Sequence, residues 1–109
     1  MATDMIEIDE SAHGGQLQMA VGEMLEVQLE ENPTAGFRWQ LISEGEPACT
    51  LVVDEFEPGD ETPGAGGHHT WQFEAVQAGD ARIELAYRRQ WMPETPAARV
   101  VIFSVHVEA

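Results

Sequence analysis

The side chains that could do chemistry in this sequence are one thiol, two neighbouring histidines and several adjacent carboxylates. Cys49 is the only cysteine, which excludes a disulfide within the chain and a cysteine-rich metal site. A catalytic thiol needs a base and an electropositive setting. The nearby acidic residues, Glu44, Glu46 and Asp54, argue against a lowered thiol pKa. We therefore expect Cys49 to be a small, partly buried apolar residue.

The two histidines, His68 and His69, follow Asp60 and Glu61 and suggest a divalent metal site, because histidine is the commonest metal ligand. Neighbouring residues that enter a strand point to opposite faces of a sheet. Both imidazoles therefore cannot easily bind one ion. The sequence predicts no metal site, and nothing in it indicates a cofactor.

Adjacent carboxylates, Glu30 with Glu31 and Asp54 with Glu55, are the remaining candidates for acid–base chemistry. In a chain this acidic such pairs arise by chance, and neighbours on a strand face apart. No nucleophile has a recognisable base beside it. We therefore do not expect an enzyme.

The balance of charge excludes two classes of partner. The net charge is −15, from 20 acidic residues against 5 basic residues, all of them arginines. Such a chain would be repelled by nucleic acid and by an anionic membrane surface. The longest apolar runs are also far too short to span a bilayer. We expect no nucleic-acid partner and no membrane partner.

The N-terminal stretch has acidic residues where an export signal would carry basic and then apolar ones. We therefore expect a cytoplasmic location for the chain as it stands, and a periplasmic or secreted one if the chain is a processed form.

The elements that position any site are predicted to be short strands. The length and the 43% hydrophobic content fit a single domain, residues 1–109. Apolar and polar residues alternate in eight segments: 5–9, 16–21, 24–29, 37–42, 50–56, 70–76, 81–87 and 99–107. The last segment is apolar on both faces near its start, which is typical of a central strand. Because no convincing helical period is present, we expect an all-β fold, an antiparallel sandwich of seven or eight strands.

Three connections between these strands are unusual. The first, residues 32–36, should be a preformed, exposed turn, because Pro33 fixes its own φ and Gly36 can adopt a positive φ. The second, residues 57–67, is long and rich in glycine, and the third, residues 88–98, contains Trp91 beside two arginines. Loops of a sandwich alternate between its two ends, so these three should share one end. We expect that end to recognise a partner.

The motifs in these connections resemble those of a known family. Asn32-Pro33-Thr34-Ala35-Gly36, followed by Trp39, is similar to an Asn-Pro-Thr-Thr-Gly turn followed by a Trp. Gly64-Ala65-Gly66-Gly67 is similar to a Gly-x-Gly-Gly loop, and Arg89-Gln90-Trp91 to an Arg-Pro-Trp loop. In this order on an all-β pattern, they resemble the chagasin-like inhibitors of cysteine peptidases, inhibitor family I42, from about Met24 to the last strand.

The resemblance implies a monomeric, immunoglobulin-like β-sandwich without catalysis of its own, which inhibits papain-like (C1) cysteine peptidases, of the papain or cathepsin L type, reversibly and tightly. It implies that Thr34 lies near the peptidase's catalytic Cys and His, that the Gly-rich loop lies along the cleft, and that Arg89 and Trp91 pack beside the active site. The implied peptidase-binding residues are Asn32, Pro33, Thr34, Ala35, Gly36, Gly64, Ala65, Gly66, Gly67, Arg89, Gln90 and Trp91.

Two positions depart from the family's pattern. Ala35 lacks the hydroxyl of the second Thr, and Gln90 in place of Pro removes rigidity that Pro93 and Pro96 can partly restore. Affinity or target choice can therefore differ from the family's. The alternative reading is a non-inhibitory immunoglobulin-like binding or adhesion module, which shares the fold and needs no cleft-binding loops.

Overall fold

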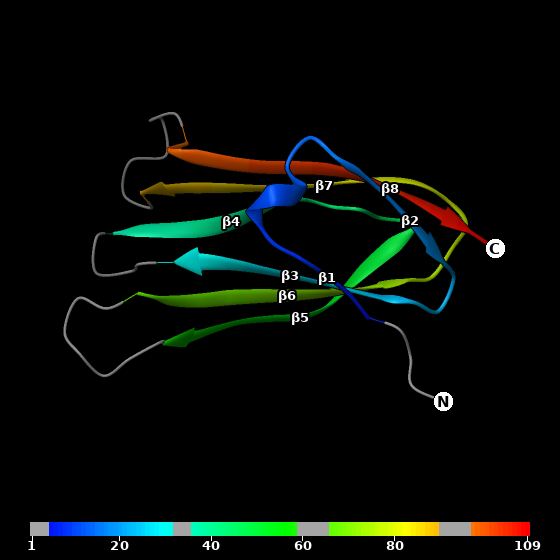
Figure 1. Cartoon of the computed structure of the whole chain (residues 1–109), viewed down its shortest axis with the longest axis horizontal. Helices are drawn as coiled ribbons and strands as arrows, with labels where there is room; N and C mark the ends of the chain where they lie inside the picture. The colour runs from blue at the N-terminus through cyan, green and yellow to red at the C-terminus, as the bar shows by residue number, and fades with distance from the viewer. Residues whose placement is uncertain (1–4, 32–35, 59–65, 90–96) are drawn as a thin grey trace.

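The computed structural model describes residues 5–31, 36–58, 66–89 and 97–109. In these segments the chain forms eight strands and one short 3-10 helix (Figure 1). The elements are β1 (Met5–Ile8), η1 (Glu10–Ala12), β2 (Gln16–Ala20), β3 (Met24–Glu31), β4 (Phe37–Glu44), β5 (Cys49–Pro58), β6 (Gly67–Ala75), β7 (Gly79–Arg89) and β8 (Arg99–Glu108). The all-β prediction is confirmed, and each predicted strand overlaps an observed one. Within these segments no helix is long and apolar enough to cross a membrane.

The strands form two four-stranded sheets that pack as a sandwich (Figure 1). The strand order is β1-β3-β6-β5 in the first sheet and β2-β8-β7-β4 in the second. The position of β8 between β2 and β7 confirms that the last strand is central. Most pairings are antiparallel, but β1 pairs with β3 and β2 pairs with β8 in parallel. The prediction of antiparallel sheets therefore holds for the other pairs only, because alternation within a strand carries no information about the direction of a distant partner.

The core lies between the sheets and consists of the apolar face of each alternating strand. The period of two residues predicted this face correctly, because successive side chains of a strand point to opposite sides of its sheet. The largest fully buried apolar side chains include Leu25, Val27, Leu29, Trp71, Phe73, Ile83, Leu85, Val101, Phe103, Val105 and Val107.

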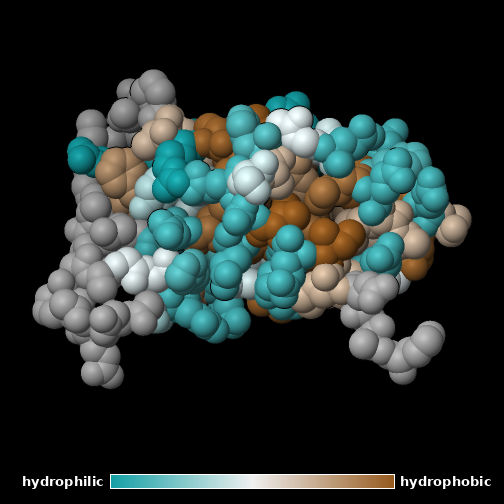
Figure 2. Space-filling view, viewed as in Figure 1, coloured by the Kyte–Doolittle hydropathy of each residue, from teal (hydrophilic) through white to brown (hydrophobic). Residues whose placement is uncertain are grey.

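The face shown in Figure 2 is largely hydrophilic. Hydrophilic side chains lie over the strands on the face shown in Figure 2, with apolar residues visible between them. This agrees with a net charge of −15, which places many carboxylates in solvent.

The segment between β1 and β2 carries the chain from the first sheet to the second. Asp9 caps η1, because its carboxylate accepts hydrogen bonds from the Ser11 N–H at 2.9 Å and the Ser11 hydroxyl at 2.7 Å. These bonds lower the pKa of Asp9. Glu10 forms an ion pair with Arg99, so η1 is tied to the first residue of β8. This contact lies at the end of the sandwich where β8 begins.

Candidate functional site

The strand ends that flank the three unusual connections lie together at one end of the sandwich. In the first sheet Gly67 pairs with both Glu31 and Pro58, so the end of β3, the end of β5 and the start of β6 are neighbours. In the second sheet Phe37 pairs with Arg89, and Arg99 pairs with Tyr87. Figure 1 shows these ends on the same side of the molecule. The prediction that the three connections leave from one end is confirmed for their flanks.

Four of the predicted binding residues belong to the described part of the chain. Gly36 has a positive φ of 84°, as the turn prediction required. Gly66 and Arg89 are exposed, whereas Gly67 is buried. The remaining predicted residues lie outside the described residues: Asn32, Pro33, Thr34, Ala35, Gly64, Ala65, Gln90 and Trp91.

Gly67 has a structural reason to be glycine. A Cβ atom on this residue would lie 2.2 Å from the carbonyl oxygen of Glu57 and 2.9 Å from Cα of Pro58. Both atoms belong to the backbone of β5, which cannot move aside without shifting the strand. The missing side chain therefore allows β5 and β6 to approach closely at the base of the second connection.

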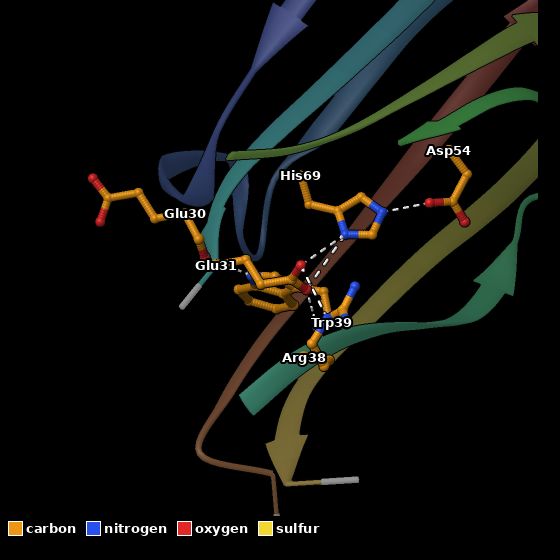
Figure 3. A network of polar contacts seen from close by, with 6 residues as sticks. All are labelled: Glu30, Glu31, Arg38, Trp39, Asp54 and His69. Carbon is orange, nitrogen blue, oxygen red and sulfur yellow. Dashed lines mark hydrogen bonds and ion pairs between the residues drawn. The ribbon is translucent and has the colours of Figure 1, made fainter. Parts of the chain in front are cut away.

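The flanks of the first connection are joined by the side chain of Glu31 (Figure 3). Its carboxylate accepts hydrogen bonds from the backbone N–H of Trp39 at 2.7 Å and from Nε of Arg38 at 3.3 Å. Nδ1 of His69 lies 3.3 Å from both carboxylate oxygens. The carboxylate is fully buried. The side chain of Glu31 thus joins the end of β3 to the start of β4 and to β6.

His69 extends this cluster across the first sheet to β5. Its Nε2 contacts a carboxylate oxygen of Asp54, and its ring stacks on Trp71 with 4.0 Å between centroids and 3° between planes. Its neighbour His68 is exposed. The two imidazoles therefore point to opposite faces, as predicted. Within the described residues no group of three or more His, Cys, Asp and Glu side chains is arranged to hold a metal ion.

Trp39 closes the gap between the two sheets beneath the first connection. Its Nε1–H donates a hydrogen bond to the carbonyl of Glu30 at 2.8 Å, and its ring meets Trp71 edge to face at 6.5 Å. The indole is 6% exposed. The indole therefore connects β4 to β3 and β6 behind the first connection.

An aromatic and cationic ladder covers the second sheet at the same end. Phe37 stacks on Tyr87 at 5.3 Å, and Tyr87 lies 4.9 Å from Trp39. Arg89 lies over Phe37 at 5.0 Å, and Arg99 lies over Trp39 at 6.0 Å. Contacts of this type stabilise a cation above an aromatic face. The ladder joins the ends of β4, β7 and β8.

Most of the positive charge of the protein lies at this end. Four of the five arginines belong to the start of β4, the end of β7 or the start of β8: Arg38, Arg88, Arg89 and Arg99. The second sheet therefore presents cationic groups here, although the chain as a whole is strongly acidic.

The thiol candidate is confirmed as an apolar core residue and is more buried than expected. Cys49 has an exposed fraction of 0%, and burial raises the pKa of its thiol. A nucleophilic cysteine needs the opposite shift and access to substrate.

The contacts among Glu31, His69 and Asp54 were not predicted from the sequence. A signal was present for two of them. The alternation that buries Leu25, Val27 and Leu29 places Glu31 on the same inward face, and the alternation through Trp71 does so for His69. The half-exposed Asp54 has no such signal, because the register of β5 shifts between Leu51 and Val53.

Comparison with known proteins gives consistent matches along most of the chain. The family model described as "Chagasin family peptidase inhibitor I42" matches residues 18–107. Chagasin of Trypanosoma cruzi is 31% identical over 103 residues, which cover 89% of this chain and 94% of chagasin. Amoebiasin-1 of Entamoeba histolytica is 33% identical over 90 residues, which cover 81% of this chain and 86% of amoebiasin-1.

Solved structures share the fold. The cysteine protease inhibitor EhICP2 of Entamoeba histolytica superimposes with a TM-score of 0.83 at 19% identity, covering 95% of each chain. PbICP-C, whose structure was determined in complex with falcipain-2, superimposes with a TM-score of 0.64 at 20% identity, covering 97% of this chain and 91% of that one. At these identities the likeness shows the fold alone. The sequence matches go further: this chain belongs to the chagasin family of peptidase inhibitors and is not an enzyme.

Proposed function

We propose that this protein is a reversible, tight-binding inhibitor of papain-like cysteine peptidases. The observation that supports the proposal most directly is the arrangement of the strand ends. The flanks of the three motif-bearing connections lie at one end of a sandwich that belongs to the chagasin family. The complex of PbICP-C with falcipain-2 shows that a protein of this fold binds a peptidase.

The proposed mode of binding is a wedge of three loops. Thr34 enters the active-site cleft near the catalytic cysteine, the Gly64–Gly67 loop follows the cleft through its main chain, and Arg89 and Trp91 pack beside it. A wedge whose flanks are already fixed loses little conformational entropy on binding, which favours slow dissociation. A standard interface buries roughly 800 Å² per partner, an area that three loop tips can cover.

The arginines at this end contribute to partner choice in the proposal. Arg89 is exposed and lies over Phe37, so it is held in place and still accessible. An exposed arginine at this end favours its contact with negatively charged groups on a peptidase surface. The association rate of such a pair falls as salt concentration rises.

Titration of papain and of a cathepsin L-like peptidase with the purified protein tests the function. We expect inhibition that reaches completion at one inhibitor molecule per active site and is reversed on dilution. Lack of inhibition at micromolar concentration by the folded protein would reject the proposal and leave the non-inhibitory binding module as the alternative.

Variants of the three loops test the wedge. Thr34→Ala, Trp91→Ala and a shortened Gly64–Gly67 loop should each weaken inhibition, mainly through faster dissociation, while the fold is retained. The matched control is Arg82→Gln, which removes the fifth arginine, on the exposed face of β7 and away from the loop end. Equal potency of all three loop variants and wild type would contradict the wedge.

A further inference from the structure

We infer that Glu31 is a positioning residue for the first connection, residues 32–36. In this inference Glu31, His69 and Asp54 form one cluster, here called the brace, that fixes the strand ends on either side of this loop. This inference rests on the proposed function, because it explains how the loop resists the peptidase it inhibits. A loop that enters an active-site cleft remains an inhibitor only while its peptide bonds stay out of the geometry needed for attack. The brace holds the end of β3 and the start of β4, the two strand ends that residues 32–36 connect.

The contacts of Glu31 reach both of these ends. Its own backbone ends β3, and its carboxylate accepts the N–H of Trp39 and Nε–H of Arg38 on β4 (Figure 3). A buried carboxylate without partners would be very unfavourable, whereas one with several charge-assisted hydrogen bonds is strongly held. A displacement of this carboxylate therefore changes the separation of the two ends of the loop.

His69 and Asp54 hold the carboxylate from its other side. The ring of His69 lies between the two acidic groups, with Nδ1 toward Glu31 and Nε2 toward Asp54. An ionised carboxylate only accepts hydrogen bonds, so a ring nitrogen that carries a proton donates to the carboxylate that it faces. The parallel stack on Trp71 fixes the plane of the ring. The imidazole thus links Glu31 to β6, which carries His69, and to Asp54 on β5.

The charge of Glu31 matters as well as its shape. Arg38 lies directly opposite Arg88 in the pairing of β4 with β7. Like charges in directly opposite positions destabilise a sheet. The carboxylate of Glu31 supplies a negative charge 3.3 Å from Nε of Arg38. A neutral side chain of the same shape would lose this compensation at the start of the loop's returning strand.

Glu30 provides a matched control for Glu31. The two residues are neighbours on β3 and carry the same group, but Glu30 is exposed and its side chain points away from the cluster (Figure 3). Glu30→Gln and Glu31→Gln therefore change the net charge equally at adjacent positions. Only Glu31→Gln alters a side chain of the brace.

The test compares both variants with wild type against papain. We expect Glu31→Gln to dissociate about tenfold faster, which corresponds to about 1.4 kcal/mol, and Glu30→Gln to behave as wild type. On prolonged incubation we expect mass spectrometry to find a single cut within residues 32–36 of Glu31→Gln only. In that cut the peptide C–N bond breaks, and one water molecule supplies a hydroxyl to the acyl carbon and a proton to the released amine.

Outcomes of this test separate the inference from the proposed function. If wild type does not inhibit, the proposed function fails, and the brace is judged by NMR: backbone order parameters of residues 34–36 should fall in Glu31→Gln and not in Glu30→Gln. If wild type inhibits and folded Glu31→Gln matches it in dissociation and remains uncut, the brace is overturned while the function stands. Cuts at many sites would show general unfolding and would also overturn it.

A second variant covers the case in which Glu31→Gln does not fold. Asp54 is half-exposed, so Asp54→Asn perturbs the core less than a change at Glu31. We expect about threefold faster dissociation for Asp54→Asn, because Glu31 keeps its contacts to β4. A rate equal to that of wild type would exclude Asp54 from the brace and overturn the inference as stated for all three residues.

Discussion

The carboxylate of Glu31 accepts the backbone N–H of Trp39 at 2.7 Å, although the two residues are eight positions apart in the sequence. This bond crosses from the first sheet to the second at the base of the first loop. A loop whose ends belong to different sheets depends on the contact between those sheets. The stability of the sandwich and the shape of the binding end are therefore linked here.

The indole of Trp39 should be important for stability. Trp39→Phe removes the 2.8 Å hydrogen bond to the Glu30 carbonyl and leaves space in the core. We expect the free energy of unfolding to fall by about 2–3 kcal/mol, measured by urea denaturation followed by circular dichroism. Val52→Ala, which shortens a side chain that is 47% exposed, is the control and should change it by less than about 0.5 kcal/mol. A loss below about 1 kcal/mol for Trp39→Phe would contradict this role.

Gly67, the first residue of β6, and Gly66, which precedes it, should respond differently to substitution by alanine. Gly67→Ala places a Cβ 2.2 Å from the Glu57 carbonyl oxygen, so we expect about 1–3 kcal/mol of destabilisation and weaker inhibition. Gly66 is exposed, so Gly66→Ala should leave the urea midpoint unchanged and affect inhibition alone. If both variants were as stable as wild type, the close approach of β5 and β6 would not need Gly67.

Cys49 should be unreactive in the folded protein. Its exposed fraction is 0%, and burial raises the pKa of the thiol above its ordinary value of 9.0. A thiol reagent such as DTNB should label no cysteine in the native state and one per chain in denaturant. Because the folded state holds this proton more tightly than the unfolded state, the free energy of unfolding should also fall as pH rises above about 9. Rapid labelling of the native protein would contradict the buried position.

The pair of His106 and Asp80 predicts a second pH dependence of stability, which comes from a charged contact rather than from burial. Nδ1 of His106 lies 2.7 Å from the carboxylate of Asp80, and this contact raises the pKa of His106 above 6.5. A raised folded-state pKa stabilises the protein below the unfolded value, and this stabilisation is lost as pH rises through the folded value. His106→Gln should therefore lower the urea midpoint slightly at about pH 5.5 and not at about pH 8.5. Asp80→Asn should reproduce this pattern, and an equal effect at both pH values would exclude the ion pair as its cause.

Much of the fold could be predicted because alternation reports local burial. The strands that bury Leu25, Phe73 and Ile83 were recognised from their own residues, and strand order along the chain then placed three connections at one end. The parallel pairing of β1 with β3 and of β2 with β8 could not be predicted, because it depends on partners distant in the sequence.

The candidate site was predicted only in part for a similar reason. Motifs predicted which connections should bind a partner, since Pro and Gly restrict the backbone locally. The brace requires side chains from β3, β5 and β6 to meet. No local pattern predicts that a buried Glu lies beside a His from another strand. A charged residue on the inward face of an alternating strand is the clue that such a partner exists.

The placement of β8 between β2 and β7 has a consequence for the order in which the second sheet can form. Among the described strands, β2 is joined to the second sheet only through β8, whereas β7 also pairs with β4. Until β8 is in place, β2 has no partner strand in this sheet and β7 has one open edge. The pairing of β2 with β8 is therefore a long-range step of folding, which joins residues 16–20 to residues 104–108 and completes the second sheet.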